Sequence, residues 1–214
     1  MAQKELEVRL RTMEVRLQTL EDIEAIEKLQ SAYCYYLEHW QTEEVVGLWS
    51  HSPDVSLEIN ESGLYKGWEK VTGYFSFSGH FYTRDTKAPP EFLHVMMPIA
   101  GIVDVDPDGK TAKGRWYGFS CNALPTGEKV LALLGTGIWE NEYVKEDGKW
   151  KFKKLFYNQI FNTPYEDGWV KTPYLRRMPA SQDKPPAPGP NTHFAPYPSG
   201  YIFPYHYKNP VTGK

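Results

Sequence analysis

Two histidines, a glutamate and a set of tyrosines are the residues of this chain best suited to chemistry. His80 and His94 lie fourteen residues apart, and Glu38 ends a tyrosine-rich helical pattern upstream of them. Imidazole titrates near neutral pH, so a histidine there can both accept and donate a proton. Tyrosine adds an apolar ring face and a hydroxyl donor. The set predicts acid–base chemistry on an aromatic compound, with His94, Glu38 and His80 as the catalytic candidates.

A second group of side chains is suited to binding such a compound. Its members are Tyr35, Arg84, Tyr117, Asn122 and Tyr157. Tyr35 lies off the apolar stripe of its helix, so its ring can face a pocket or a neighbouring subunit. Tyr117 and Asn122 lie on opposite faces of one predicted strand, and either face can line the site. Arg84 follows the first histidine closely and can bind an acidic group.

Each catalytic candidate also has a purely structural interpretation. His94 can be a hydrogen-bonded core residue, His80 a surface residue beside aromatic neighbours, and Glu38 an exposed residue at a helix end. A buried carboxylate needs a partner, so a pocket role for Glu38 depends on one. A buried histidine–carboxylate pair would favour an enzyme, whereas a filled cone or a solvent-facing His94 would favour a non-catalytic binding protein.

The chain begins with a helical pattern that carries an apolar seam. Leu6, Leu10, Met13, Leu17 and Leu20 recur at alternating spacings of four and three, as the a and d positions of a coiled coil do. Two heptads are too short to be stable alone, so this helix must pack on its own domain or on a partner subunit. The sequence at 19–22 fits a capping box and predicts that a second helix starts there.

The remaining pattern predicts two further helices and a run of strands. The helices are expected at 43–49 and 68–77, and the strands at 55–59, 63–67, 93–105, 111–123, 130–144 and 150–161. Turn signals between the long strands indicate hairpins. Helices followed by hairpin-linked strands predict an α+β fold with an antiparallel sheet.

The composition changes after residue 164. Ten of the chain's 17 prolines lie between Pro173 and Pro210, together with many tyrosine and phenylalanine rings. Proline-rich tails are often disordered, but these rings need an apolar surface. We therefore expect an extended arm that docks on the domain or on a neighbouring subunit. The predicted organisation is an N-terminal helix extension (1–18), one domain (19–161) and a Pro- and Tyr-rich arm (162–214).

The bulk composition excludes several classes of protein. The 214 residues carry a net charge of −3, from 24 basic and 27 acidic side chains, so there is no reason to expect a nucleic-acid partner. No stretch is long and apolar enough to span a membrane, and the charged N-terminus does not resemble a secretory signal. Cys34 and Cys121 are too few for a disulfide framework. We expect a cytoplasmic protein with no membrane partner.

Two further expectations concern cofactors and assembly. The sequence has no Cys or His pair at metal-ligand spacing and no Gly-rich phosphate loop, so we expect catalysis without a metal or an organic cofactor. The apolar seam and the aromatic arm both need a surface to cover. We therefore expect a homo-oligomer, a trimer in preference to a dimer.

Three segments resemble the NTF2-like superfamily, and more closely its SnoaL-like and scytalone-dehydratase-like branch. They are residues 21–29 with Tyr33, residues 93–114, and residues 147–152. The resemblance covers about residues 19–161 and implies an NTF2-like cone, in which a curled antiparallel sheet surrounds the N-terminal helices and an apolar pocket. It also implies that His94 points into that pocket.

The same resemblance bears on the other two catalytic candidates. Glu38 falls where many members carry a pocket Asp near the end of the first helix, and it is longer by one methylene. His80 is in place to supply the second histidine of the dehydratase pattern, although its spacing to His94 is not diagnostic.

The resemblance implies a cofactor-independent lyase for an aromatic small molecule. Cofactor-free diarylpropane lyases of bacterial lignin catabolism belong to the superfamily, and the 15% aromatic content of this chain suits such a substrate. This predicts release of formaldehyde from a lignin-derived diarylpropane to leave a stilbene. The alternatives are a dehydratase, an isomerase or cyclase of an aromatic or polyketide-like substrate, or a non-catalytic protein that binds small molecules.

Overall fold

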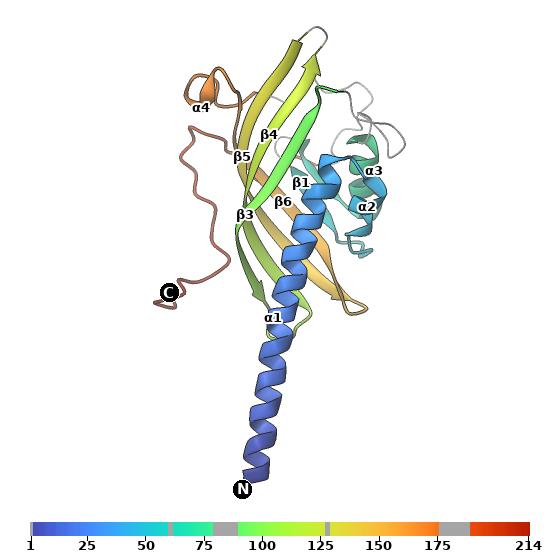
Figure 1. Ribbon diagram of the computed structural model, residues 1–214, viewed down its shortest axis with the longest axis vertical. Coiled ribbons are helices and arrows are strands. Elements are labelled where there is room, and N and C mark those ends of the chain that lie inside the picture. The colour runs from blue at the N-terminus through green and yellow to red at the C-terminus, as the bar shows by residue number, and fades with distance from the viewer. Residues whose placement is uncertain (1, 60–61, 79–89, 127–128, 176–188) are drawn as a thin grey trace.

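A long helix, a curled sheet and a C-terminal arm make up the fold (Figure 1). The computed structural model describes residues 2–59, 62–78, 90–126, 129–175 and 189–214. The helices in this part of the chain are α1 (Ala2–Glu38), α2 (Thr42–Gly47), α3 (Trp68–Ser78) and α4 (Gly168–Lys171), and the strands are β1 (Ser56–Ile59), β2 (Leu64–Lys66), β3 (Leu93–Val105), β4 (Thr111–Thr126), β5 (Lys129–Glu146) and β6 (Lys149–Pro164). Every strand that we expected from the sequence is confirmed.

The described strands form one sheet in the order β2-β1-β6-β5-β4-β3. Neighbouring strands are antiparallel, except that β1 and β6 are parallel. The β5–β6 hairpin turns on Asp147 and Gly148, whose φ angles of 49° and 75° suit the left-handed two-residue turn of a tight hairpin. The long strands curl around α1 (Figure 1). The α+β fold class and the cone implied by the NTF2-like resemblance are therefore confirmed.

The first helix is continuous, which corrects the expectation that a second helix starts at 19–22. Thr19 does not act as a cap, because its Oγ1 donates to the carbonyl of Val15 inside the helix, 3.0 Å away. A cap must stand outside the helix that it starts, and no glycine or proline breaks α1. The expected boundary at residue 18 thus falls within a helix, and the division into three parts stays a prediction.

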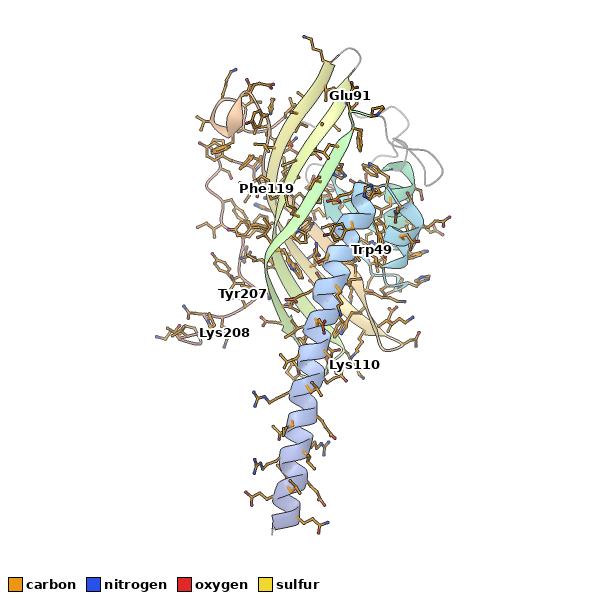
Figure 2. All side chains as sticks on the ribbon, viewed as in Figure 1. Trp49, Glu91, Lys110, Phe119, Tyr207 and Lys208 are labelled. Carbon is orange, nitrogen blue, oxygen red and sulfur yellow. The ribbon has the colours of Figure 1, made fainter. Side chains whose placement is uncertain are left out.

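Buried polar contacts fix the second half of α1 to the sheet. The carboxylate of Asp22 accepts hydrogen bonds from Lys145 Nζ at 2.6 Å and from Trp150 Nε1 at 2.9 Å. Further along the helix, Gln30 Oε1 accepts a hydrogen bond from Asn141 Nδ2 at 2.9 Å. The first half of α1 has no such support and projects past the sheet, as Figures 1 and 2 show.

Aromatic rings fill the space between α1 and the sheet. The buried rings of this core belong to Tyr33, Trp49, Tyr65, Phe75, Trp116, Trp139, Tyr143, Trp150, Phe152 and Tyr157. Two of them pack close against Gly118, since a Cβ there would come within 2.8 Å of both Trp139 and Tyr157. A residue with a side chain at this position would push those rings away. Much of the aromatic content of the sequence therefore forms the core.

The described part of the arm docks on the outer face of the sheet. The carboxylate of Glu58 in β1 is 3% exposed and accepts hydrogen bonds from Thr192 N and Oγ1, both at 2.6 Å, and from His193 N at 3.3 Å. On β4, Arg115 donates to the carbonyl of Pro204 at 3.0 Å. The sequence left the partner of the arm open, and these contacts lie within its own domain.

The end of the arm covers a charged cluster on the same face. Arg115 forms an ion pair with Glu140, and its guanidinium lies 4.6 Å from the centre of the Tyr205 ring. His206 Nδ1 lies 3.0 Å from Glu140 Oε2. The guanidinium of Arg115 can pair with a carboxylate and stack on an aromatic ring at the same time, so both contacts favour the charged side chain in this buried place.

Candidate active site

His94 lies on the inner face of β3, close to the end of α1. Its side chain is 8% exposed, and its ring stacks on the Trp40 indole, with 5.7 Å between ring centroids and 15° between ring planes. His94 pairs with Asn122 across the β3–β4 ladder, so both side chains leave the sheet on the same side. Stacking and burial together fix the orientation of the imidazole, which is what a group that transfers protons requires.

Trp40 reaches His94 because the end of α1 has a backbone conformation that is unusual for tryptophan. Its φ of 49° is left-handed, and hydrogen bonds from Trp40 N to Leu37 O (3.1 Å) and from Gln41 N to Tyr36 O (2.9 Å) form a Schellman motif. Glycine is the usual residue here, because a side chain in this conformation costs about 1–2 kcal/mol. The ring stack offsets that strain, so the helix end and His94 form one local structure.

Glu38 connects the end of α1 to the strand that carries His94. Its Oε1 accepts a hydrogen bond from the backbone N–H of Met96, 2.8 Å away. β3 is the edge strand of the described sheet, so this bond satisfies an edge group. His94 and Met96 are alternate residues of one strand, with their Cα atoms about 6.6 Å apart. The carboxylate therefore fastens the end of α1 to the strand that carries the imidazole.

A group of buried polar side chains continues from His94 across the inner face. Ser120, Asn122 and Gln159 are between 1% and 3% exposed. Within the described part of the chain, the hydroxyl of Ser120 and both amide atoms of Asn122 and Gln159 have no hydrogen-bond partner, and neither has Asn162 Oδ1. A buried polar group without a partner costs about 1–3 kcal/mol. These groups can therefore bind the polar atoms of a ligand or water.

Gly135 brings three of these side chains together. A Cβ at Gly135 would lie 2.7 Å from Ser120 Oγ, 2.8 Å from Gln159 Nε2 and 3.4 Å from Asn162 Oδ1. The three polar atoms therefore surround one point above the sheet, although they come from two strands. A side chain at position 135 would displace them, so the glycine is needed for the group to form.

Two ionisable groups of α1 lie behind this site and stay neutral near pH 7. Burial raises the pKa of Tyr33 well above its ordinary value. Burial also raises the pKa of Cys34, and the nearby Glu38 carboxylate raises it further. Neither residue is therefore a nucleophile or a base in this structure, and both belong to the core.

The other sequence candidates are placed in different ways. Tyr157 is 4% exposed and packs on Trp139, and its hydroxyl lies 3.4 Å from the Gly118 carbonyl, so it forms part of the inner core. Tyr117 is 51% exposed on the outer face, so the structure does not bring it to His94. The reason is strand alternation, because Asn122 takes the inner face and Tyr117 has the opposite parity.

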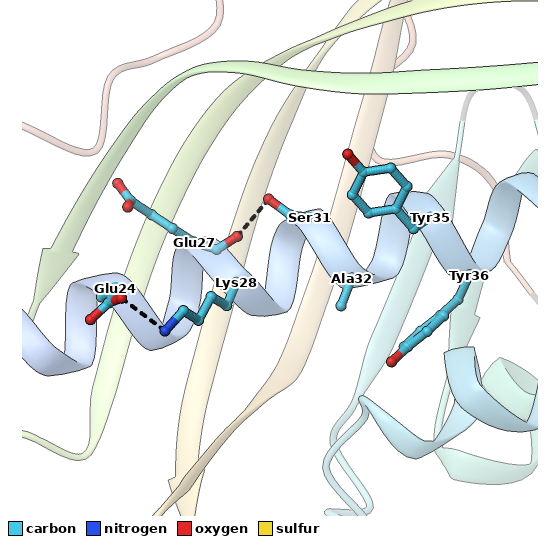
Figure 3. Close-up of a pocket in the computed structure, with 7 residues that line it drawn as sticks. All are labelled: Glu24, Glu27, Lys28, Ser31, Ala32, Tyr35 and Tyr36. Carbon is cyan, nitrogen blue, oxygen red and sulfur yellow. Dashed lines mark hydrogen bonds and ion pairs between the residues drawn. The ribbon is translucent and has the colours of Figure 1, made fainter.

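Tyr35 is also turned away from His94. It is 66% exposed and lines an open groove on the outside of α1 together with Glu24, Glu27, Lys28, Ser31, Ala32 and Tyr36, as Figure 3 shows. The groove has a volume of about 520 Å³ and is crossed by the Lys28–Glu24 ion pair at 2.8 Å. His80 and Arg84 lie outside the described residues, so their roles stay predictions.

Trp40, Ser120, Gln159 and Asn162 are the site residues that the sequence did not reveal. Ser120 shares the parity of Asn122 on one strand and could have been included on that ground. Gln159 and Asn162 are three residues apart, which predicts opposite faces. A bulge in β6 places both on the inner face, since Gln159 pairs with Gly137 and Asn162 with Gly135.

Neither a metal-binding cluster nor a membrane-spanning helix occurs in the described residues. No three His, Cys, Asp or Glu side chains there are placed to hold a metal ion. No helix there is long and apolar enough to cross a membrane. The expected independence from cofactors and the expected cytoplasmic location stay predictions.

Comparison with known proteins identifies a family and solved structures that are similar to this chain. A family model described as a SnoaL-like domain matches residues 18–155. Among solved structures, a candidate scytalone dehydratase from Novosphingobium aromaticivorans matches with a TM-score of 0.56 and 18% identity, over 76% of this chain and 98% of the other. A hexachlorocyclohexane dehydrochlorinase, LinA-type3, from Novosphingobium barchaimii matches with a TM-score of 0.56 and 18% identity, over 76% and 99%. A Mycobacterium tuberculosis protein of unknown function, Rv3472, matches with a TM-score of 0.53 and 19% identity, over 77% and 88%.

Proposed function

Because this chain belongs to the SnoaL-like family, we propose that it is a cofactor-independent lyase that acts on a phenolic or other aromatic small molecule by acid–base catalysis. The observation that carries the proposal is His94, which is buried on the inner face and stacked on Trp40. An imidazole in a fixed, desolvated position can take a proton from a substrate and return it. The polar side chains beside it can bind the hydroxyl groups of the same substrate.

His94 is the acid–base residue of this proposal, and Glu38 is a positioning residue. One oxygen of Glu38 is engaged by the Met96 N–H at 2.8 Å, so the carboxylate fixes the strand on which His94 lies. Trp40 fixes the imidazole from the other side, and its indole is also an apolar surface next to the site. Asn122, opposite His94 in the ladder, has donor and acceptor atoms that can orient a substrate hydroxyl.

The more specific form of the proposal is deformylation of a lignin-derived diarylpropane. A histidine acid protonates the benzylic hydroxyl, which leaves as water while a para-phenolate supplies the electrons and forms a quinone methide. A base then removes the proton of the terminal hydroxymethyl group. The bond between the carbinol carbon and the chain breaks, formaldehyde leaves, and the electron pair restores the aromatic ring to give a stilbene. Diarylpropane thus yields stilbene, formaldehyde and water.

Two of the proteins that share this fold suggest a second reaction to test. The names of the two Novosphingobium proteins describe a dehydratase and a dehydrochlorinase, and both activities remove a small molecule from neighbouring carbon atoms. At 18% identity these matches carry the fold and not the reaction. A dehydratase is therefore the second candidate function. It uses the same acid and base but removes a C–H proton and releases water alone.

Product analysis with a matched pair of substrates tests the proposal. The purified full-length protein is incubated with a 1,2-diarylpropane-1,3-diol that carries a para-hydroxyl group, and separately with its para-methyl ether. We expect stilbene and formaldehyde in equal amounts from the phenol and neither product from the ether, because the ether cannot form the quinone methide. Loss of water without formaldehyde would support the dehydratase instead. Binding of the phenol without any turnover would contradict catalysis altogether.

A further inference from the structure

The first half of α1 carries exposed apolar side chains where it projects past the sheet (Figure 2). We call Leu6, Leu10, Met13, Leu17 and Leu20 the seam, and each is between 51% and 64% exposed. Single exposed leucines are common on protein surfaces, but a continuous row of five on one helix marks an interaction surface. Nothing in the described part of this chain covers the seam.

The seam lies on the side of α1 that is turned away from the sheet. At 3.6 residues per turn, Leu17 and the buried Tyr33 differ by about 160° around the helix axis. Leu17 and Tyr35 are eighteen residues apart, or about five full turns, so they lie on one line. The seam therefore continues into the open groove of Figure 3, where Tyr35 is 66% exposed. This surface is free to contact another molecule along the helix.

The charged residues beside the seam indicate the charge pattern and the orientation of the helix that the seam can bind. Leu10 and Leu17 occupy a positions, so Arg9 and Arg16 occupy the g positions, and Glu7, Glu14 and Glu21 occupy the e positions. In a parallel coiled coil the g residue of one helix faces the e residue of the next heptad on its neighbour. Arg9 then faces Glu14 of the second helix, and Arg16 faces Glu21. An antiparallel pairing would instead place arginine against arginine and glutamate against glutamate.

We propose that the seam binds the seam of a second copy of this chain in a parallel, in-register coiled coil. The pattern of basic g and acidic e positions is complementary to itself only in this orientation. Two heptads are marginal for isolated peptides, but here the helix is already formed, because its second half is fixed to the sheet through Asp22. Association therefore does not have to nucleate the helix. A third copy of this chain can join the coiled coil through the same contact between seams.

Disulfide trapping in the full-length protein tests the contact. In a parallel coiled coil, two cysteines at one a position bring their Cα atoms within about 7 Å, a distance that a disulfide can bridge. We expect Leu17→Cys to form a covalent dimer under mild oxidation. Val15→Cys is the matched control, because Val15 is 61% exposed, close to the 58% of Leu17, but lies on another side of the helix. Equal trapping at both positions, or none at Leu17, would overturn the proposal.

A charge exchange tests the orientation. In the Leu17→Cys background, Arg9→Glu with Arg16→Glu places glutamate against glutamate and should slow disulfide formation, on the order of tenfold. Adding Glu14→Arg and Glu21→Arg reverses every pair and should restore the original rate. Failure of the fourfold variant to recover would rule out the parallel pairing. The wild-type chain, oxidised in the same way, measures any background from Cys34 and Cys121.

Discussion

The part of the inner face beside His94 and the outer face of the sheet both bury polar side chains, and they differ in how those side chains are paired. On the outer face, Glu58 accepts hydrogen bonds from four groups of the arm, and Arg115 lies against Glu140 and the Pro204 carbonyl. On the inner face, Ser120 and Gln159 are buried as deeply, but no described residue bonds to their polar side-chain atoms.

Under the proposed function, this difference separates structural from ligand-binding polar groups. Pairing offsets the cost of removing a charge or a hydroxyl from water, so the outer groups can hold the arm in place. A group that lacks a protein partner contributes no such stability. Under the proposed function, a ligand bound next to the buried histidine supplies the missing hydrogen bonds. Variants on the two faces should therefore have opposite effects on stability and on activity.

The largest effect is expected for His94→Ala on the inner face. If His94 transfers protons, its loss should lower kcat by about 10²–10⁴-fold, the range that general acid–base catalysis contributes. The measurement is the rate of stilbene and formaldehyde formation from the phenolic diarylpropane. Formation of product at near wild-type kcat would show that His94 is only a packing residue.

The controls for His94→Ala separate chemistry from folding. A thermal melt should show a folded protein, although the cavity left beside Trp40 can lower the melting temperature by a few degrees. Glu38→Gln keeps the shape of the side chain and a hydrogen bond to Met96, so it should lower kcat less than His94→Ala does. Equal losses in the two variants would assign proton transfer to Glu38 as well.

On the outer face, Glu58→Ala should destabilise the protein without changing kcat. The substitution removes the acceptor of the Thr192 hydroxyl, the Asn191 amide and two backbone N–H groups, so we expect a loss of about 3 kcal/mol in the free energy of unfolding. The matched control is Glu142→Ala, since the Glu142 side chain is 44% exposed and pairs with Lys154 only at 3.6 Å. Proteolysis should cut the arm faster in Glu58→Ala alone. A strong effect on kcat would contradict the division between the faces.

Asp22 tests whether pairing gives stability on the inner side too. Burial would raise its pKa, but hydrogen bonds from Lys145 and Trp150 outweigh burial and lower the pKa from 3.8. The ionised form is therefore favoured in the folded state. The resulting stability is fully present above the unfolded pKa and is lost as the pH falls through the lowered folded pKa.

The test for Asp22 is a pair of unfolding curves as a function of pH. Asp22→Asn should cost about 1–2 kcal/mol at pH 7, and the difference from wild type should shrink below about pH 4. A difference that stays constant down to pH 2 would mean that ionisation of Asp22 does not contribute.

The fold could be read from the sequence more fully than the site. Alternation and turn residues predicted β3 with its bounds at 93 and 105, and the same alternation placed Tyr117 and Asn122 on opposite faces. Alternation cannot say which face is inner, because that depends on what packs against the strand. Which face is inner follows only from the structure, in which Asn122 pairs with His94 and Tyr117 is exposed on the opposite face. The sequence alone therefore left Tyr117 as a candidate.

Two features of the site depend on irregular backbone, which a periodic pattern cannot reveal. The bulge in β6 brings Gln159 and Asn162 to one face although their spacing is odd. Trp40 occupies a left-handed position that sequence rules reserve for glycine, so nothing marked it as a partner of His94. The helix boundary at 19–22 failed for a related reason. Thr19 fits a capping box, but a capping box forms only at the start of a helix. Thr19 lies in the interior of α1.

The smallest loss of stability is expected for Ser120→Ala, set against Thr192→Val on the outer face. Both substitutions remove one hydroxyl group. The Thr192 hydroxyl donates to Glu58 at 2.6 Å, so its loss should cost about 1–2 kcal/mol. The Ser120 hydroxyl has no partner among the described residues and is unfavourable where it is buried, so its loss should not lower the free energy of unfolding and should raise it by about 1 kcal/mol. If the substrate forms a hydrogen bond with the Ser120 hydroxyl, Ser120→Ala should raise KM for the phenolic substrate, because that hydrogen bond is lost. Equal destabilisation by the two variants would mean that Ser120 is paired in solution and that the inner face is built like the outer one.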